Sequence, residues 1–157
     1  MALELSELNP AEADAVIVVV KKSFDACVAP DYDKQGRDLF VRIVTADYLR
    51  SLPPRQGFAL VAKLDRRIVG MCAFRDGHHV TLFFVLPEFQ GQGIGKKLFD
   101  SAVERVQRNV PEVIKLEVHS SPVAVPVYQA LGFAVTGPET VEDGIRYIPM
   151  EHLLSAV

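Results

Sequence analysis

In the first half of the chain, the apolar residues follow the period of a helix in some segments and the alternation of a strand in others. From Ala13 to Cys27 the apolar residues recur with the helical period of about 3.6, and Asn9-Pro10 supplies a cap and a first helical residue. The pattern predicts a second helix over residues 37–52, closed by Pro53-Pro54. Residues 2–8 alternate loosely and predict a first strand. The chain is therefore expected to open with one strand and two helices.

Three short apolar runs follow, and each has the composition of a β-strand. They cover residues 58–64, 68–74 and 80–85 and contain many β-branched and aromatic side chains. Asp65-Arg66-Arg67 separates the first two runs, and Asp76-Gly77 is a hairpin signal before the third. We therefore expect three consecutive antiparallel strands.

Helices and strands alternate in the rest of the chain. A helical pattern runs from Ile94 to about Val110, where Pro111 ends it. Because a helical crossover joins parallel strands, the strand predicted at 114–118 should lie parallel to the one at 80–85. The last predicted elements are a short helix at 123–131 capped by Gly132, and strands at 133–136 and 145–150 with a turn near 142–144. This order predicts an α/β fold (a mixed α+β sheet) with one parallel strand pair and about four helices.

Composition places the chain among ordinary globular proteins and excludes several function classes. Its 157 residues fit a single domain over residues 1–157, with 49% hydrophobic and 24% charged residues. The net charge of −3 gives no basic footprint for nucleic acid, and no apolar run is long enough to span a membrane. Cys27 and Cys72 lack the spacing of a disulfide framework or a metal site. We expect reduced thiols, no metal and a cytoplasmic location.

A glycine-rich loop before the helix at Ile94 is the strongest chemical signal. It contains three alternating glycines followed by two lysines: Gly91, Gly93, Gly95, Lys96 and Lys97. Backbone N–H groups of such a loop converge at the positive end of a helix dipole, which suits a phosphate or pyrophosphate. A tight turn without a ligand would also explain the glycines. A Rossmann-type dinucleotide site is a further alternative, with Glu117 as the ribose-binding acid, but Lys96 stands where the third glycine belongs.

Two separated motifs resemble one known family. The segment 90–95 reads QGQGIG and fits the pattern Q/R-x-x-G-x-G/A, and residues 84–89 (FVLPEF) resemble the strand end and turn before it. Residues 121–133 read SPVAVPVYQALGF and resemble the later tyrosine and Leu-Gly-Phe segment of the same family. The chain thus resembles the GNAT superfamily of N-acetyltransferases over nearly its whole length.

The resemblance implies acetyl-coenzyme A as cosubstrate and an amine as acceptor. In that family the strand ending at Val85 splays away from the strand ending at Val118, and the pantetheine arm lies in the opening. The residues that the resemblance assigns to the coenzyme are Phe84, Val85, Gln90, Gly91, Gln92, Gly93, Ile94, Gly95, Lys96, Ser121 and Tyr128.

The resemblance also names a candidate acid and a candidate base. Tyr128 falls at the family's tyrosine position and would protonate the leaving thiolate, although a core aromatic would have the same spacing. The backbone N–H of Val85 would donate to the thioester carbonyl. His79 lies where several members carry a catalytic Glu or His, although a polar residue at a hairpin mouth would explain it equally. Glu117, Asp143 or a chain of waters are the alternative bases.

Two positions depart from the family pattern. Ser121 stands where Asn is more usual, so its contact to the coenzyme is weaker or absent. Pro126 lies close before Tyr128, and proline in a helix interior removes a backbone donor. The helix therefore starts late or is kinked.

The acceptor side is expected in two loops. By resemblance these are residues 29–34 and 139–147, whose acids would attract a cationic amine unless they are only solvated. The candidate acceptor residues are Phe24, Tyr32, Glu117, Asp143 and Arg146, the last of which would instead suit a carboxylate. Two functions stay open: an acetyltransferase for a small-molecule or peptide amine, or a coenzyme A-binding regulatory protein without turnover. The sequence is compatible with a monomer or a homodimer.

Overall fold

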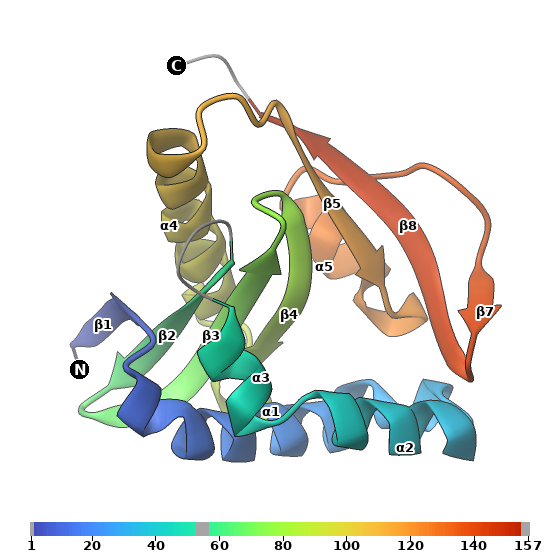
Figure 1. Cartoon of the computed structure of the whole chain (residues 1–157), viewed down its shortest axis with the longest axis horizontal. Helices are drawn as coiled ribbons and strands as arrows, with labels where there is room; N and C mark the ends of the chain where they lie inside the picture. Colours follow the sequence, from blue (N-terminus) through green and yellow to red (C-terminus); the bar gives the residue numbers. More distant parts are fainter. Residues whose placement is uncertain (1, 53–56, 155–157) are drawn as a thin grey trace.

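A single curved sheet with helices on both faces forms the molecule (Figure 1). The computed structural model describes residues 2–52 and 57–154, so the predicted Pro53-Pro54 helix end lies outside the described residues. The strands are β1 (Leu3–Glu7), β2 (Phe58–Leu64), β3 (Arg67–Arg75), β4 (His79–Val85), β5 (Lys115–Ser120), β6 (Ala134–Val135), β7 (Thr140–Glu142) and β8 (Ile145–Leu153). Their order in the sheet is β1-β2-β3-β4-β5-β8-β6, with β7 paired to β8 outside this path.

The sheet combines an antiparallel meander with one parallel junction, which confirms the predicted fold class. Strands β1 to β4 pair antiparallel in sequence order, β5 lies parallel to β4, and β8 returns antiparallel to β5. Hairpins at Asp65-Arg66 and Asp143-Gly144 have two central residues with positive φ, as type I′ hairpin turns require. The predicted turn at Asp76-Gly77 has the same backbone signs.

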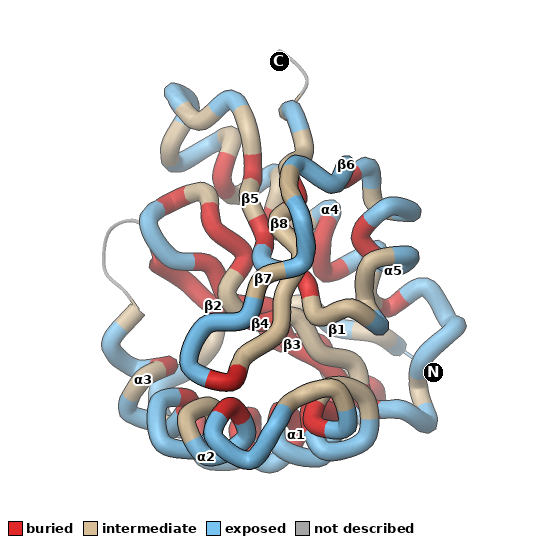
Figure 2. The backbone as a smooth tube through the Cα atoms, turned by 90° about the vertical axis from the view of Figure 1, so that its right-hand side faces the viewer, coloured by how far each residue is buried: buried red, intermediate tan, exposed pale blue. Residues whose placement is uncertain are grey.

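The helices cover the two faces of the sheet separately. Helix α1 (Ala13–Cys27) packs with α3 (Ala46–Ser51) on the face that includes Val61, Met71 and Leu82. Helix α4 (Ile94–Asn109) lies on the opposite face over Leu60, Cys72 and Val80. The inner sides of these helices are buried, and their outer sides are exposed (Figure 2). No helix within residues 2–52 and 57–154 is long and apolar enough to cross a membrane.

The predicted second helix is in fact two helices. Helix α2 (Lys34–Ile43) and α3 are separated at Val44, which turns into the core, and Thr45. The Thr45 side chain accepts a hydrogen bond from the Tyr48 N–H, and Asp33 caps α2 in the same way. The prediction was wrong because the non-helical pair Val44 and Thr45, with the Thr45 cap, interrupts one apolar pattern.

The C-terminal elements differ from their predicted bounds. Strand β7 was not predicted, since its three residues are too short for a periodic signal. A 3-10 turn over Pro122–Ala124 precedes the α-helix α5 (Val125–Ala130), so Pro126 occupies the first turn, where a backbone N–H has no helical partner anyway. The helix therefore starts late and is not kinked. Gly132 follows α5 with φ +105°, as predicted for its cap position.

A β-bulge bends β4 where it leaves β5. Ala73 of β3 faces Leu82 and Phe74 faces Val80, so Thr81 is the extra residue on β4. The register between β4 and β5 contains only the pairs His79–Glu117 and Val80–Val118 in the described chain. Beyond these two pairs the strands diverge, as Figure 1 shows.

Candidate active site

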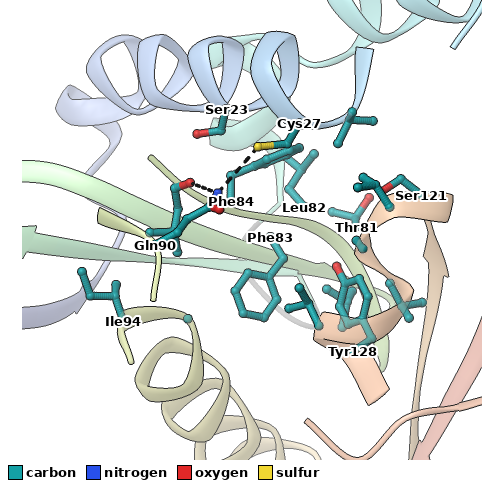
Figure 3. Close-up of a pocket in the computed structure, with 18 of the residues that line it drawn as sticks. Ser23, Cys27, Thr81, Leu82, Phe83, Phe84, Gln90, Ile94, Ser121 and Tyr128 are labelled. Carbon is teal, nitrogen blue, oxygen red and sulfur yellow. Dashed lines mark hydrogen bonds between the residues drawn. The ribbon is translucent and has the colours of Figure 1, made fainter. Parts of the chain in front are cut away.

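A cavity of about 430 Å³ lies between the diverging strands and continues beneath α1. Residues from the end of β4, the glycine loop, the end of β5 and α5 form one part of it (Figure 3). Residues of α1, α2 and the segment between them form the other part. The lining includes Ser23, Cys27, Tyr32, Phe40, Thr81, Phe83, Phe84, Val85, Gln90, Gly91, Gly93, Ile94, Gly95, His119, Ser121 and Tyr128.

The glycine loop lies at the N-terminus of α4 and borders the cavity. Gly91 and Gly93 have φ of +79° and +82°, and a Cβ built on either meets no atom within 4 Å. Their lack of a side chain therefore serves the backbone conformation and leaves the space beside the loop open. Gly95 has another role, because its built Cβ lies 3.3 Å from the Phe83 ring. This combination of an open loop and a helix N-terminus can hold an anion.

The side chain of Gln90 links the glycine loop to β4 and α1. Its Nε2 donates to the Val85 carbonyl oxygen at 3.0 Å and lies 3.6 Å from Cys27 Sγ. The side chain therefore connects the end of β4, the start of the loop and the end of α1. Gln92 and Lys96 lie on the solvent side of the loop, and Lys96 pairs with Asp100 one helical turn further on.

Tyr128 is a buried tyrosine whose side chain reaches the cavity from α5. It is 8% exposed, and its ring packs edge-on against Phe83 and Phe133 with centroid distances of 5.9 and 5.4 Å. Burial raises the pKa of its hydroxyl well above the usual value of 10.0. The hydroxyl therefore keeps its proton over the whole physiological pH range.

A row of three rings crosses β4, β5 and β8 beside the cavity. His79 packs edge-on against His119 at 5.0 Å, and His119 stacks on Tyr147 at 4.1 Å. His119 lines the cavity, whereas His79 is 8% exposed and does not contribute to the lining. Burial is the main reason that the pKa of His79 falls to about 4, and burial together with Arg75 lowers the pKa of His119 below 6.5.

Comparison with known protein families agrees with this geometry. The model of the acetyltransferase (GNAT) domain matches residues 28–154. The chain belongs to the GNAT acetyltransferase family. The sequence-based resemblance is thereby confirmed for the family and the fold.

Individual relatives of the chain are distant in sequence and close in structure. Peptidyl-lysine N-acetyltransferase YjaB of Salmonella typhimurium is 25% identical over 154 residues, 98% of this chain and 99% of the relative. The PaiA N-acetyltransferase of Thermoplasma acidophilum, solved in complex with coenzyme A, superimposes with a TM-score of 0.81 at 19% identity, covering 98% and 100% of the two chains. The solution structure of apo YjaB from Escherichia coli superimposes with a TM-score of 0.72 at 23% identity, covering 98% and 97%.

The structure divides the acceptor residues expected from the family resemblance into two groups. Tyr32 lines the cavity, and Phe24 lies behind it, stacked on Phe40 with a centroid distance of 3.8 Å. Glu117, Asp143 and Arg146 do not contribute to the lining, and both Glu139 carboxylate oxygens accept hydrogen bonds from Arg146 Nη2. Of these expected acceptor residues, Tyr32 alone therefore faces the cavity.

Several residues that line the cavity were not predicted. The strand prediction ended at Val118, one residue before His119, and the stack of His119 on Tyr147 joins residues far apart in sequence. Thr81 faces the cavity because of the bulge, which leaves no signal in one sequence. The alternation of apolar and polar residues over residues 114–118 continues at His119, and this continuation was the available hint for that residue. Within residues 2–52 and 57–154, no group of three or more His, Cys, Asp and Glu side chains is arranged to hold a metal.

The buried imidazole of His79 makes the stability of the protein depend on pH. Its pKa of about 4 lies below the ordinary 6.5, so the unfolded chain takes up a proton at higher pH than the folded chain. Above pH 6.5 the protonation of His79 does not lower the free energy of unfolding. As the pH falls from 6.5 to about 4, the unfolded chain is protonated first, and the free energy of unfolding falls by on the order of 3 kcal/mol. Urea unfolding of the native protein and the His79→Gln variant at pH 7.5 and 4.5 measures this loss. The variant should lose less stability between the two pH values, and an equal loss in both proteins would contradict the expectation.

Proposed function

We propose that this chain transfers an acetyl group from acetyl-coenzyme A to a primary amine by direct attack in a ternary complex. One observation carries the proposal. The open glycine loop, the edge of β4 that has no strand partner among residues 2–52 and 57–154, and the buried Tyr128 hydroxyl border one cavity. Membership of the GNAT acetyltransferase family supports the reaction type. The cavity has one part beside the glycine loop and another part beside α1 and α2, and these two parts would bind the two substrates.

The residues around the glycine loop fit coenzyme A. The backbone N–H groups from Gly91 to Lys96 would hold the pyrophosphate, because the two open glycines leave space for it at the helix N-terminus. Beyond Val80, the side of β4 that faces away from β3 has no ladder partner within the described chain. Phe84 and Val85 would therefore offer backbone groups to the pantetheine amides, as a neighbouring strand would. Ser121 borders the same part of the cavity and would contact the arm through its hydroxyl.

Acetyl-coenzyme A supplies an activated thioester, and the protein has to manage two protons. Tyr128 holds a proton at the cavity wall and would donate it to the departing sulfur. The Val85 N–H would polarise the thioester carbonyl. No metal is required by this scheme.

The proton of the attacking amine goes to His119 in this proposal, and not to His79. His119 lines the cavity and is unprotonated at neutral pH, since its pKa lies below 6.5. His79 packs against the edge of His119 and, being buried and neutral, orients that ring without adding a charge. Glu117 and Asp143, the other candidate bases, lie outside the lining.

A thiol-release assay with acetyl-coenzyme A and a panel of amines tests the function. The panel should include lysine-containing peptides, because the relative YjaB is a peptidyl-lysine N-acetyltransferase. Mass spectrometry should show the acceptor heavier by one acetyl group for every thiol released. Thermal stabilisation by coenzyme A without transfer to any amine would overturn the proposal and favour a binding protein without turnover.

The pH profile of kcat at saturating amine tests the role of His119. A base must be unprotonated to act, so the rate should fall on the acidic side with a midpoint below pH 6.5, the ordinary histidine value. The His119→Asn variant should be slower and should lose this acidic limb. An unchanged limb in the variant would assign the proton to another group. His78→Asn is the matched control, since His78 is a histidine outside the cavity lining.

A further inference from the structure

Helix α5 carries Tyr128 on a short segment that has little packing of its own. Of the six residues Val125–Ala130, Tyr128 is the one that is buried. Val127 beside it is 55% exposed. The Tyr128 side chain points from this helix into the cavity (Figure 3). The direction of its hydroxyl therefore depends on the groups that hold the end of the helix.

The turn that ends α5 is tied to Tyr128 through the backbone. The Tyr128 carbonyl oxygen accepts hydrogen bonds from the N–H groups of Leu131 and Phe133, both at 3.0 Å. Gly132 lies between these two donors with φ +105°. A movement of this turn would therefore also move the backbone of Tyr128.

His152 of β8 holds the same turn from the sheet. Its Nδ1 lies 3.0 Å from the Gly132 carbonyl oxygen. Because a carbonyl oxygen only accepts, Nδ1 carries the proton of this hydrogen bond. A Cβ built on Gly132 would lie 2.8 Å from two atoms of the imidazole, so a side chain at this position would push the ring away. The absence of a side chain at Gly132 thus permits the contact with His152.

The imidazole of His152 is also packed among aromatic rings. Its centroid lies 5.4 Å from that of Phe133 and 5.8 Å from that of Phe99 on α4. The Phe133 ring in turn packs edge-on against Tyr128. His152 therefore reaches Tyr128 by two routes, the hydrogen bond to the turn and the ring of Phe133. Both routes start on β8, which is fixed by its antiparallel pairing with β5.

We infer that His152 is a positioning residue, which holds the turn after α5 so that the Tyr128 hydroxyl is directed at the departing sulfur. His152 does not contribute to the cavity lining, so its effect reaches the reaction through Tyr128. A displacement of a reacting group by about 1 Å can lower a rate by about 100-fold. This inference rests on the proposed function and adds a residue to the machinery of the same site.

The His152→Phe variant keeps an aromatic ring at this place and removes the donor to Gly132. It should lower kcat about tenfold, less than the full cost of a 1 Å displacement, because the ring contacts remain. The dissociation constant of coenzyme A, measured by calorimetry, should stay unchanged. His152→Asn restores an N–H donor close to the position of Nδ1, and it should be faster than His152→Phe.

Thr140→Val is the matched control for the loss of this hydrogen bond. Thr140 Oγ1 also donates to a backbone carbonyl oxygen, that of Pro138, and it lies on β7 outside the cavity lining. The Thr140→Val variant should keep the native kcat.

A double-mutant cycle with Tyr128→Phe separates positioning from a general loss of structure. When the Tyr128 hydroxyl is absent, the replacement of His152 has no acid left to misplace. His152→Phe should therefore lower kcat about tenfold in the native protein and less than about twofold in the Tyr128→Phe protein. His152→Leu, which also lacks the donor, should give the same pattern, so the result does not depend on the folding of one variant.

The outcomes separate this inference from the proposed function. An equal fold-change in both backgrounds would overturn the inference, because His152 would then act without the Tyr128 hydroxyl, and the function would stand. A native kcat in both His152→Phe and His152→Leu would do the same. Binding of coenzyme A with transfer to no amine at all would overturn the proposed function, and the role of His152 with it.

Discussion

Replacing Tyr128 by phenylalanine should lower kcat by about 100-fold or more, the usual contribution of general acid catalysis. The hydroxyl is the only atom removed, and the ring keeps its edge-on contacts with Phe83 and Phe133. Without it, the leaving thiolate of the proposed reaction has to take its proton from water. Because the raised pKa keeps the hydroxyl protonated, the loss should be similar at every pH at which the protein is folded.

Steady-state kinetics with saturating amine, together with calorimetry of coenzyme A binding, measures this effect. The dissociation constant should change little, since the lost group acts on the reaction and not on the bound ground state. Tyr48→Phe is a suitable control, because it also removes a tyrosine hydroxyl, one that lies 3.3 Å from Thr81 Oγ1. A kcat within twofold of the native value would remove Tyr128 from the mechanism and make it a packing residue.

Replacing Gly93 by valine should weaken coenzyme A binding about tenfold. A Cβ at this position has no atom within 4 Å, so steric clash with the protein is not the cause. The cause is the backbone, since φ of +82° costs a β-branched residue about 1–2 kcal/mol, and 1.4 kcal/mol corresponds to tenfold in affinity. The loop would leave this conformation, and its N–H groups would no longer converge.

Titration calorimetry of the Gly93 variants with coenzyme A tests the backbone explanation. Gly93→Asn is the matched comparison, because asparagine adds a side chain but adopts positive φ more readily than valine. The asparagine variant should bind more tightly than the valine variant. Equal, near-native binding by both would show that the loop does not need its left-handed residue to hold the coenzyme.

Local patterns were sufficient for most of the sheet and for the glycine loop. The strand β2 has the predicted bounds, because a short apolar run between turn residues has one compatible structure. Helix α4 begins at Ile94 as predicted, directly after the glycine that caps it. The position of Pro126 also proved informative, since proline is compatible with the first turn in which it lies.

The acceptor side was beyond these patterns for physical reasons. A glycine such as Gly36 looks like a weakness in a helix, and its purpose appears only when the β7–β8 turn, more than one hundred residues later, comes to lie against it. The ring contact between His119 and Tyr147 depends on how β5 and β8 pair. The bulge at Thr81 depends on the register of β4 against β3. Each of these features is a property of contacts between elements.

The short junction between β4 and β5 divides the sheet into two parts. We call these parts plates and the junction between them the seam. Strands β1 to β4 form one plate, and β5, β6 and β8 form the other, with two residue pairs between them. His79 belongs to one of these pairs, so its protonation would place a buried charge in the seam itself. Protonation of His79 would therefore weaken the contact between the two plates. A molecule lying in the opening would, in turn, brace the two plates against each other.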